Sequence, residues 1–242
     1  MMQPDTAVIL CAGLGERMRP LSLTTPKPLL HLAGQPILAH TMARLREAGV
    51  TKILANASYL SEQVESFFRP YDNVTVLREE ALLETGGGLA AMAAKGVLPE
   101  APFYVLNGDC FWVDGPSPAL RRLATAFDPA REDATLLLAR SAGTIAETRF
   151  GDFVWPREGE LRRRQEREVA PYLYSGIQII TKALLHGAAV ERFSMNRLWD
   201  EALAQERLNA IIHDGVWFHL STPEDLDRAE ELLAAREVGN ST

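Results

Sequence analysis

The 242-residue chain is poor in cysteine, in long apolar runs and in positive charge, and each shortage argues against a class of protein. Its two cysteines are too few for a disulfide-stabilised scaffold, which favours a reducing compartment. No apolar stretch approaches the roughly 20 residues of a membrane-spanning helix, and the first residues have no signal-peptide pattern. A net charge of −7 argues against a nucleic-acid partner, because phosphate backbones favour a basic face. We therefore expect a cytoplasmic protein with no membrane and no nucleic-acid partner.

Internal repeats, low-complexity tracts and Ser/Gly-rich linkers are also absent, so nothing in the sequence marks a domain boundary. Hydrophobic residues make up 47% of the chain, which is enough for a sizeable core. Short apolar runs alternate with amphipathic segments. This alternation predicts an α/β fold with a doubly wound, Rossmann-like, mostly parallel (mixed) sheet flanked by helices. We expect one domain over residues 1–242, with a β-rich insertion at about 149–180 in its second half.

The hydrophobic pattern also locates individual elements. Apolar runs predict strands at 7–11, 52–56, 74–77, 102–106, 134–139, 208–213 and 216–220. Helical periodicity predicts helices from 37 up to a terminating Gly49, at 61–68, 88–96, 183–189 and 195–205, and from 223 to about 236. Thr222 is a good N-cap for the last of these helices, and Pro223 suits its first turn.

The most informative segment follows the first predicted strand and reads Leu10-Cys11-Ala12-Gly13-Leu14-Gly15-Glu16-Arg17-Met18-Arg19-Pro20. Glycines directly after a first strand let the backbone approach a ligand, and successive amide N–H groups can hold phosphate oxygens. The cations Arg17, Arg19 and Lys27 stand close behind these glycines, and prolines on both sides of Lys27 stiffen the chain around it. The pattern indicates a site for a small phosphorylated ligand. The alternative is a structural turn with surface cations.

Two well-known phosphate-binding motifs do not fit this segment. A dinucleotide fingerprint needs a third glycine where Met18 stands, and an acidic residue near the end of the second predicted strand, which instead ends in Asn56. A Walker loop needs Gly-Lys-Ser or Gly-Lys-Thr, which this segment lacks. The sequence therefore argues against a dehydrogenase and against a P-loop NTPase.

Asp109 follows the predicted strand 102–106 as part of Asn107-Gly108-Asp109. Ligands of open α/β sheets bind beyond the carboxyl ends of the strands, so this carboxylate stands where a site is expected. Mg²⁺ prefers oxygen ligands and usually binds through one or two carboxylates together with substrate phosphates. Asp109 is therefore the best candidate metal ligand, and Asn107 is a candidate nucleotide contact. The alternative is that both residues only form the following turn.

The glycine segment and the Pro26-Lys27-Pro28 that follows it resemble the G-x-G-x-R-[ML]-x-P-L…P-K-P signature of sugar-1-phosphate nucleotidyltransferases. The resemblance continues along most of the chain. Leu83–Gly88 (LETGGG) is similar to the family's base-reading loop, and Tyr174–Ile177 (YSGI) to its sugar-pocket strand. The alternative for the glycines of LETGGG is a structural entry into the following helix. Val216–Glu224 (VWFHLSTPE) resembles the family motif W-x-D-[VI]-G-T-P-E. The LETGGG sequence is most similar to N-acetylmuramate-1-phosphate uridylyltransferases, while mannose-1-phosphate guanylyltransferases carry a related loop with TAG.

The resemblance implies that a sugar 1-phosphate attacks the α-phosphorus of a nucleoside triphosphate and releases pyrophosphate, with Mg²⁺ as the cofactor and Mn²⁺ as the alternative. It implies catalytic roles for Arg17, Lys27 and Asp109. The nucleotide-binding residues that it implies are Ala12, Gly13, Gly15, Glu16, Arg17, Lys27, Glu84, Thr85, Gly86, Gly87 and Asn107. The implied sugar contacts are Asp152, Ser175 and Gly176. Residues 1–112 would then form roughly the nucleotide-binding half and 113–242 the sugar-binding half, in a monomer or homodimer.

The sequence departs from the family at one metal position. The family's second metal-binding aspartate corresponds to His219, and the glycine two residues later to Ser221. Imidazole suits softer metals better than Mg²⁺. The metal would then be held by Asp109, phosphates and water, or His219 would bind Mn²⁺ or a phosphate, or catalysis would be lost. A lysine that several relatives use on the sugar phosphate is also missing. One arginine of the basic run Arg162, Arg163, Arg164 and Arg167 is then a substitute, or the run is a solvated loop.

Three functional hypotheses remain open at this point. The first is uridylyl transfer to N-acetylmuramate 1-phosphate, a step of peptidoglycan recycling. The second is guanylyl transfer to mannose or heptose 1-phosphate. The third, suggested by His219, is a catalytically inactive regulatory subunit that binds nucleotide sugars. The base and the sugar are not decided by the sequence alone.

Overall fold

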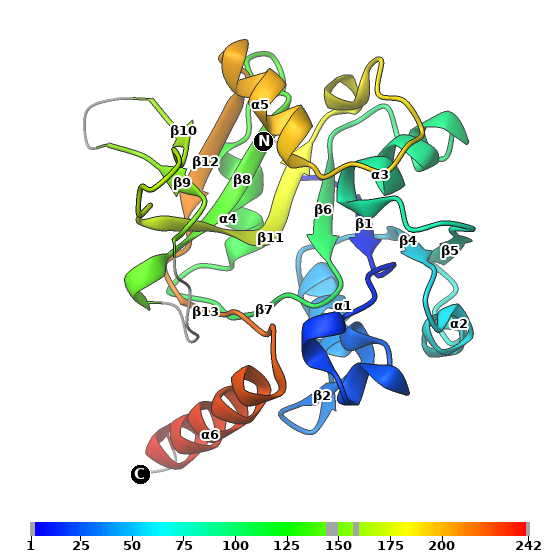
Figure 1. The fold of residues 1–242 in the computed structure, drawn as a ribbon, viewed down its shortest axis with the longest axis vertical. Helices are drawn as coiled ribbons and strands as arrows, with labels where there is room; N and C mark the ends of the chain where they lie inside the picture. The colour runs from blue at the N-terminus through cyan, green and yellow to red at the C-terminus, as the bar shows by residue number, and fades with distance from the viewer. Residues whose placement is uncertain (1–2, 144–149, 157–159, 241–242) are drawn as a thin grey trace.

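The structure is a computed structural model that describes residues 3–143, 150–156 and 160–240. Within these residues the core is a nine-stranded mixed sheet (Figure 1). Its first half pairs four parallel strands in the order β5-β4-β1-β6. These strands are β1 (Thr6–Leu10), β4 (Lys52–Ala57), β5 (Val74–Arg78) and β6 (Phe103–Asn107). The predicted doubly wound sheet is confirmed on this side.

The second half of the sheet is antiparallel where it joins the first. The nine-residue β11 (Tyr172–Ile180) pairs antiparallel with β6 on one side and with β8 (Ala134–Arg140) on the other. Beyond β8 lies the parallel β12 (Leu208–Ile212), and the first residue of β11 also pairs with β9. Two short strands, β9 (Phe153–Val154) and β10 (Arg162–Arg163), lie in the predicted insertion, which also includes β11. The sheet is therefore mixed, as expected.

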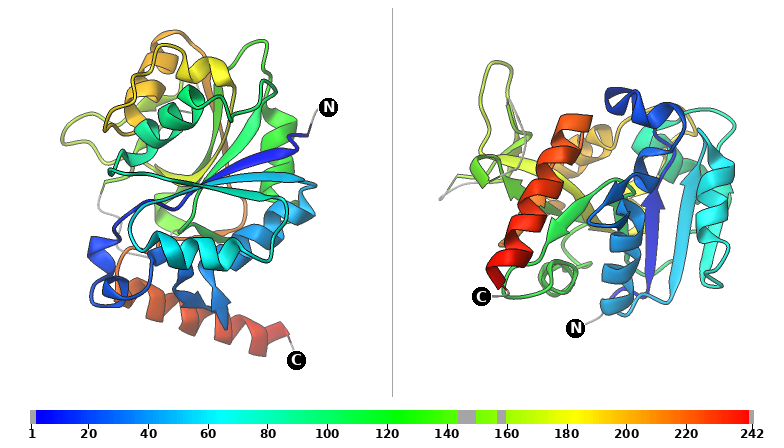
Figure 2. Two further views of the ribbon diagram at one scale, coloured as in Figure 1. Left: turned by 90° about the vertical axis from the view of Figure 1, so that its right-hand side faces the viewer. Right: turned by 90° about the horizontal axis from the view of Figure 1, so that it is seen from below.

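Helices cover both faces of the sheet, which Figure 2 shows in its left-hand view. The helices on one face are α1 (Ile37–Glu47), α2 (Ser61–Phe68) and α4 (Ala119–Ala126). Those on the other are α3 (Glu84–Ala94) and α5 (Asn196–Ala204). Strand β1 shows why both layers are needed: Ala7 and Ile9 pack in the first cluster, whereas Val8 between them packs in the second. A strand buried on both faces reads as a continuous apolar run.

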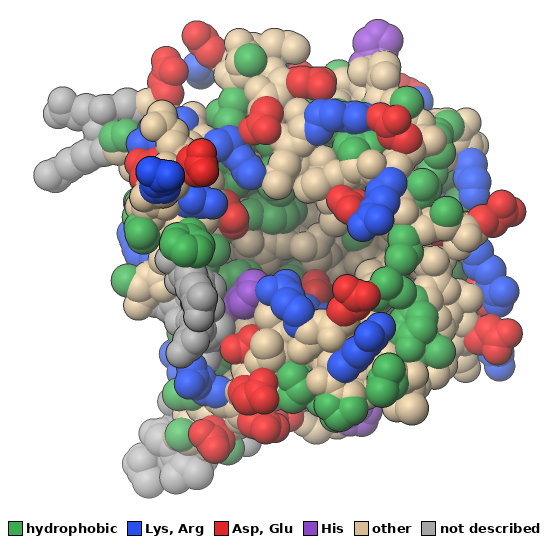
Figure 3. Space-filling view, viewed as in Figure 1, with side chains coloured by type: hydrophobic (Ala, Val, Ile, Leu, Met, Phe, Trp, Pro, Cys, Tyr) green, Lys and Arg blue, Asp and Glu red, His purple; other side chains and the backbone are tan. Residues whose placement is uncertain are grey.

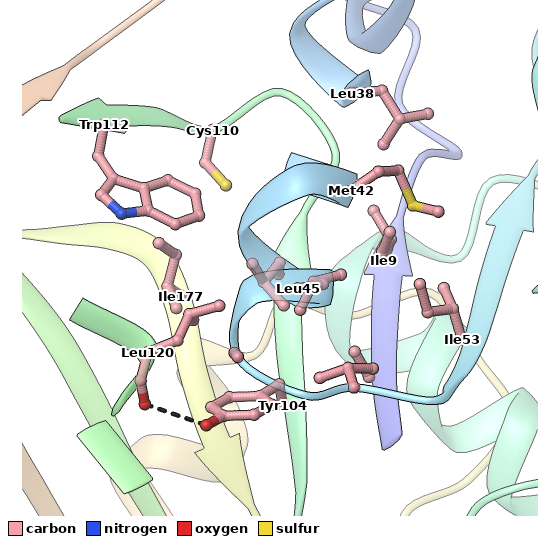
Figure 4. Close-up of a cluster of buried hydrophobic side chains, with 14 of the residues drawn as sticks. Ile9, Leu38, Met42, Leu45, Ile53, Tyr104, Cys110, Trp112, Leu120 and Ile177 are labelled. Carbon is pink, nitrogen blue, oxygen red and sulfur yellow. Dashed lines mark hydrogen bonds between the residues drawn. The ribbon is translucent and has the colours of Figure 1, made fainter. Parts of the chain in front are cut away.

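The core on the α1 face is drawn in Figure 4, where Leu38, Met42 and Leu45 of α1 lie over Ile9 and Ile53 of the sheet. Nearly all of these side chains are fully buried. Each such side chain removes enough apolar surface from water to stabilise the fold by about 1.5–3 kcal/mol. The buried Tyr104 hydroxyl donates to the Leu120 carbonyl over 3.0 Å, so the polar group in this cluster is satisfied.

A third cluster joins the two ends of the chain. It contains Met18 just after the glycine loop and Phe218 on β13 (Val216–Phe218), which pairs with β7 (Phe111–Val113). The last helix, α6 (Pro223–Asn240), packs on this cluster and on the hairpin of β2 (His31–Leu32) and β3 (Gln35–Pro36). Its predicted cap is confirmed, because the Thr222 hydroxyl accepts the Asp225 amide over 3.2 Å. This packing places the segment around His219 next to the glycine loop.

Several element boundaries differ from those predicted. Helix α3 begins four residues earlier than the predicted 88–96, and α6 ends at Asn240 rather than near 236. The predicted helix 183–189 is wrong: the structure has a short 3₁₀ turn, Lys182–Leu185, because Gly187 takes a φ of 75° that ends the turn. The prediction of an insertion over 149–180 includes residue 149 and residues 157–159, which lie outside the described residues. None of the described helices combines the length and apolarity needed to span a bilayer.

One buried histidine at the β7–β12 junction predicts a pH effect on stability. Burial lowers the pKa of His213 below its ordinary 6.5, although Asp114 and Asp214 partly oppose this shift. Its Nε2 lies 3.1 Å from the Val113 carbonyl oxygen, and Asp214 is ion-paired to Arg122. Below about pH 6.5 the unfolded chain therefore binds more protons at this site than the folded chain, so folding stability falls as the pH falls.

Replacing His213 with Gln should remove this contribution. In thermal melts from about pH 8 to about pH 5, the melting temperature of His213→Gln should decline less steeply than that of the wild type. A parallel decline in the two proteins would show that His213 does not contribute to the acid sensitivity.

Candidate active site

Three adjoining cavities open at the carboxyl ends of β1, β4 and β6, where Figure 3 shows a hollow in the surface. The glycine-loop cavity, of about 560 Å³, is lined by residues 10–17 together with Asn56 of β4, the start of α3 and Arg192. The central cavity, of about 170 Å³, lies between Asp109 and His219. The outer cavity, of about 450 Å³, lies over Asp152 and Trp199. Arg17 and Asn107 line all three, so the cavities meet at these two side chains.

The glycine loop is held in place by two hydrogen bonds. The Cys11 amide donates to Asn56 Oδ1 over 2.7 Å, and the Ser22 hydroxyl donates to the Gly15 carbonyl over 2.7 Å. Gly15 has a φ of 60°, a left-handed conformation that glycine adopts without strain. Gly13 has no atom near the position where a Cβ would stand, so its backbone is open to a ligand. The predicted loop residues that line this cavity are Ala12, Gly13, Gly15, Glu16 and Arg17.

Asp109 and Lys27 form an ion pair at the junction of the glycine-loop and central cavities. Lys27 Nζ lies 2.5 Å from Asp109 Oδ2, and both side chains line both cavities. Burial raises the pKa of Asp109, but the Lys27 charge and hydrogen bond outweigh it, so the pKa of this carboxyl is lowered and the group is ionised. A Cβ at Gly108 would lie only 2.7 Å from Cys11 Sγ, which shows how closely the Asp109 strand end approaches the glycine loop.

The donor set fits a metal that arrives with phosphates better than a metal held by the protein alone. Among the described residues, no group of three or more His, Cys, Asp and Glu side chains is placed to bind a metal. Asp109 offers carboxylate oxygens to the cavity, and one carboxylate plus substrate phosphates is a usual Mg²⁺ arrangement. Lys27 contacts only Oδ2 of this carboxylate, so Oδ1 would be the oxygen for a metal while Lys27 stays in place.

His219 lines the central cavity as a neutral ring. Burial, together with the charges of Lys27 and Arg17, lowers its pKa below the ordinary 6.5. Its Nε2 lies 2.6 Å from the Ser221 hydroxyl, so the two residues that replace the family's Asp and Gly contact each other. A neutral imidazole bonded to a hydroxyl is a hydrogen-bonding group rather than a hard oxygen ligand. The role of His219 toward a metal stays a prediction.

The predicted base-reading residues divide into two groups. Glu84 and Thr85 line the glycine-loop cavity, but Gly86 and Gly87 are not among the residues that line it. The two glycines lie in the first turn of α3, and their amides donate to the Phe193 carbonyl over 3.0 and 3.1 Å. In the structure the backbone of these glycines approaches residues 191–193, and their contact with a base stays a prediction.

The predicted sugar contacts also lie in different cavities. Asp152 lines the outer cavity, and its Oδ2 accepts the Tyr174 amide over 2.9 Å. Ser175 and Gly176 instead line the central cavity, at a bulge where β11 shifts register against β8. The Ser175 hydroxyl is buried and has no hydrogen-bond partner within the described structure. Tyr174 lines both cavities and connects the two groups.

The basic run after the insertion is accounted for by local contacts. Arg162 pairs with Glu168 over 2.7 Å, and the Arg163 guanidinium lies 4.9 Å from the centre of the Phe153 ring. Arg164 lies over the Phe150 ring. Neither these three arginines nor Arg167 lines any of the three described cavities, which agrees with the alternative of a solvated loop.

Both cysteines are packing residues in the structure. Cys11 and Cys110 are buried at the two strand ends, and burial raises the pKa of each thiol far above its ordinary range. A thiol with a raised pKa is a poor nucleophile at neutral pH. This agrees with a site that works by positioning and charge.

Sequence reasoning missed several residues that line the cavities. Arg192 lines the glycine-loop cavity, and Gln178, Ser194 and Asn196 line the outer one. The Asn56 side chain also lines the glycine-loop cavity while holding the loop. Of these, only Asn56 had a usable signal, because it stands at the carboxyl end of a predicted strand next to the glycine loop.

The site combines a glycine loop, cations and a strand-end carboxylate on a mixed α/β sheet. These features suit the binding of a nucleotide's phosphates. The solved structure of UDP-glucose pyrophosphorylase complexed with UDP-glucose shares the fold, with a TM-score of 0.79 at 15% identity over 96% of this chain and 99% of that one. The chain belongs to the family of MobA-like NTP transferase domains, which matches residues 7–213. The resemblance to sugar-1-phosphate nucleotidyltransferases is thereby confirmed.

Relatives with named substrates cover most of the chain. The N-acetylmuramate alpha-1-phosphate uridylyltransferase of Caulobacter vibrioides is 32% identical over 96% of this chain and 98% of its own length. The enzyme of that name from Neisseria meningitidis serogroup B is also 32% identical, over 95% and 98%. Mannose-1-phosphate guanyltransferase beta-A of Xenopus laevis is 30% identical over 90% of this chain and 62% of its own length.

Proposed function

We propose that the chain transfers a uridylyl group from UTP to N-acetylmuramate 1-phosphate and releases pyrophosphate. The observation that carries this proposal is the sharing of Arg17 and Asn107 by all three cavities. A nucleotide in the glycine-loop cavity and a sugar phosphate entering from the outer cavity would meet at these side chains. Such positioning of two reactants can supply about 7–11 kcal/mol of a reaction barrier.

The chemistry requires charge to be offset rather than a nucleophile to be activated. An oxygen of the sugar phosphate, already deprotonated, forms a bond to the α-phosphorus as the bond to the β-phosphate oxygen breaks and pyrophosphate leaves. The amides of Gly13 and Gly15, which line the glycine-loop cavity, would hold phosphate oxygens. Arg17 and Lys27, which line it too, would offset negative charge on the α-phosphate and the departing pyrophosphate. Mg²⁺ bound through Asp109 would neutralise further phosphate charge.

The sugar side supports a substrate larger than a bare hexose phosphate. The outer cavity adds amide and hydroxyl groups from Gln178, Ser194 and Asn196 to the carboxylate of Asp152. These groups can bond hydroxyls and an acetamido group. Arg17, which also lines this cavity, offers a cation to the lactyl carboxylate that distinguishes muramate from glucosamine. The two uridylyltransferase relatives, matched over nearly their full lengths, favour the same substrate pair.

The direct test is pyrophosphate release with Mg²⁺ or Mn²⁺ across a matrix of nucleoside triphosphates and sugar 1-phosphates. UTP with N-acetylmuramate 1-phosphate should be the most productive pair, and N-acetylglucosamine 1-phosphate, which lacks the carboxylate, should have a lower kcat/KM. A charge-assisted hydrogen bond to this group, worth roughly 1.5–3 kcal/mol, corresponds to a preference on the order of 10- to 100-fold.

Other outcomes of the same matrix would replace the proposal. Turnover of GTP with mannose or heptose 1-phosphate would keep the mechanism and assign the second hypothesis. Nucleotide binding without pyrophosphate release for any pair would favour the regulatory-subunit hypothesis and direct attention to His219.

A further inference from the structure

One segment of the chain lines both the glycine-loop cavity and the outer cavity. We call residues 191–196 the bridging segment. Arg192 lines the glycine-loop cavity, whereas Ser194, Met195 and Asn196 line the outer cavity. The segment therefore carries side chains toward the proposed nucleotide site and the proposed sugar site within five residues. A shift of this segment would alter both sites together.

The bridging segment is fastened to the first turn of α3 by backbone hydrogen bonds. The Phe193 amide donates to the Leu83 carbonyl over 3.0 Å, and the Phe193 carbonyl accepts the amides of Gly86 and Gly87. The first amides of a helix have no partner within the helix, and here a carbonyl distant in sequence satisfies two of them. The Met195 amide also donates to Thr85 Oγ1 over 3.1 Å.

Side chains fasten the same contact from the outside. Arg192 Nε donates to Glu84 Oε1 over 2.8 Å at the mouth of the glycine-loop cavity. The Phe193 ring is buried, and the Arg197 guanidinium lies 3.6 Å from its centre. The bridging segment thus covers the start of α3 with its backbone, one buried ring and one ion pair.

Glycine is required at this contact for a steric reason. A Cβ at Gly86 would lie 2.3 Å from Phe193 Cε2 and 2.5 Å from Cδ2. A Cβ at Gly87 would lie 2.0 Å from the Glu191 carbonyl oxygen, which is backbone and cannot rotate away. Both distances are far below van der Waals contact, so any side chain at either position would push the bridging segment off α3.

We propose that Gly86 and Gly87 are positioning residues that seat the bridging segment and thereby set the nucleotide and sugar sites at once. The proposal rests on the proposed function for the identity of the two sites. It assigns the glycines of the LETGGG motif to the docking of residues 191–196 instead of to contact with the base. Their amides already bond Phe193, and their α-carbons face the bridging segment.

The test is a double-mutant cycle between Gly86→Ala and Phe193→Ala, with kcat/KM and binding of UTP and of N-acetylmuramate 1-phosphate measured separately. Gly86→Ala should lower kcat/KM by roughly 10²-fold and weaken binding of both ligands, because a displacement near 1 Å at a site can cost that much. In the Phe193→Ala background the same change should have little further effect, because the clashing ring atoms are gone. The remaining contact, 3.0 Å to the Phe193 carbonyl oxygen, needs only a small shift.

Gly87→Ala is the matched comparison. Its clash is with the Glu191 backbone, so Phe193→Ala should not rescue it. Should Gly86→Ala alone fail to fold in thermal melts, a folded double variant as active as Phe193→Ala alone would give the same support. Non-additive energies of this kind mark residues in direct contact.

Two results would overturn the proposal. One is weaker binding of UTP with unchanged binding of the sugar phosphate in Gly86→Ala, which a base-reading role predicts. The other is an equal loss on Gly86→Ala in both backgrounds. Failure of the proposed function is separate, because it would appear in the wild type as the absence of turnover with this substrate pair. The cycle would then be measured with whichever nucleotide and sugar phosphate the wild type binds.

Discussion

Asp109→Asn should lower the rate of pyrophosphate release by roughly 10²–10³-fold, the effect of removing one preorganised electrostatic contact. The amide keeps the size of the side chain but removes the negative charge that Lys27 contacts over 2.5 Å and that would bind Mg²⁺. An uncharged amide binds Mg²⁺ more weakly than a carboxylate does. The loss should appear mainly in kcat, and raising the Mg²⁺ concentration should restore part of it.

Asp72→Asn is the matched control, since Asp72 is an exposed carboxylate on the loop between α2 and β5 and lines none of the three cavities. This variant should have the wild-type rate. Nucleotide binding measured by calorimetry without metal should persist in Asp109→Asn, because the glycine-loop amides and Arg17 are unchanged. Wild-type turnover in Asp109→Asn, at a Mg²⁺ concentration that does not saturate the wild type, would remove Asp109 from the mechanism.

The parts of the site that could be predicted from the sequence are local ones. The glycine loop, Lys27 and Asp109 each follow directly from a strand end or a rigid turn, so a short stretch of sequence determines both structure and position. The parallel strands were equally visible, because strands buried on both faces read as apolar runs. The end of strand β13 and the 3₁₀ turn near 183 were harder to predict. The ends of elements depend on tertiary contacts, which the local sequence does not contain.

The part that could not be predicted depends on contacts between distant segments. Three consecutive glycines have low helix propensity, so the sequence predicts a helix only from Gly88 onward. In the structure the LETGGG motif begins α3, because the Phe193 carbonyl accepts the amides of Gly86 and Gly87. Nothing in the local sequence around residue 193 announces this contact. The sequence assigned this motif to the base only through its resemblance to the family. The packing of Gly86 and Gly87 against Phe193 is visible only in the folded structure.

The His219 position is explained in part by its surroundings. In the central cavity its neutral ring and the Ser221 hydroxyl stand beside two cations, Arg17 and Lys27, and one lining carboxylate, Asp109. A further carboxylate, Asp225, accepts the Ser221 amide and acts on the His219 ring from outside this lining. The residues that line this cavity carry more positive than negative charge. Neutral hydrogen-bonding groups complete the lining. That balance favours a phosphate over a second divalent cation. We therefore expect His219 to face a phosphate rather than a second metal ion.

Arg17→Ala should lower kcat/KM for both substrates by roughly 10²–10³-fold, because Arg17 lines all three cavities and no ion pair to it is found among the described residues. Its charge is thus available to whichever phosphate lies at the junction. Arg17→Lys should recover part of the loss, since it keeps the charge but not the planar, forked geometry that binds two phosphate oxygens.

Arg19→Ala is the internal control for Arg17→Ala, because Arg19 lies two residues further along the same exposed turn. It lines none of the three cavities, and its guanidinium is 3.9 Å from the Glu16 carboxylate. Steady-state kinetics with each substrate varied in turn should show a wild-type kcat/KM for Arg19→Ala. Equal losses in the two variants would mean that the general positive charge of the turn matters and not the placement of Arg17. A loss in Arg17→Ala confined to one substrate would mean that the cavities do not meet at this residue during the reaction.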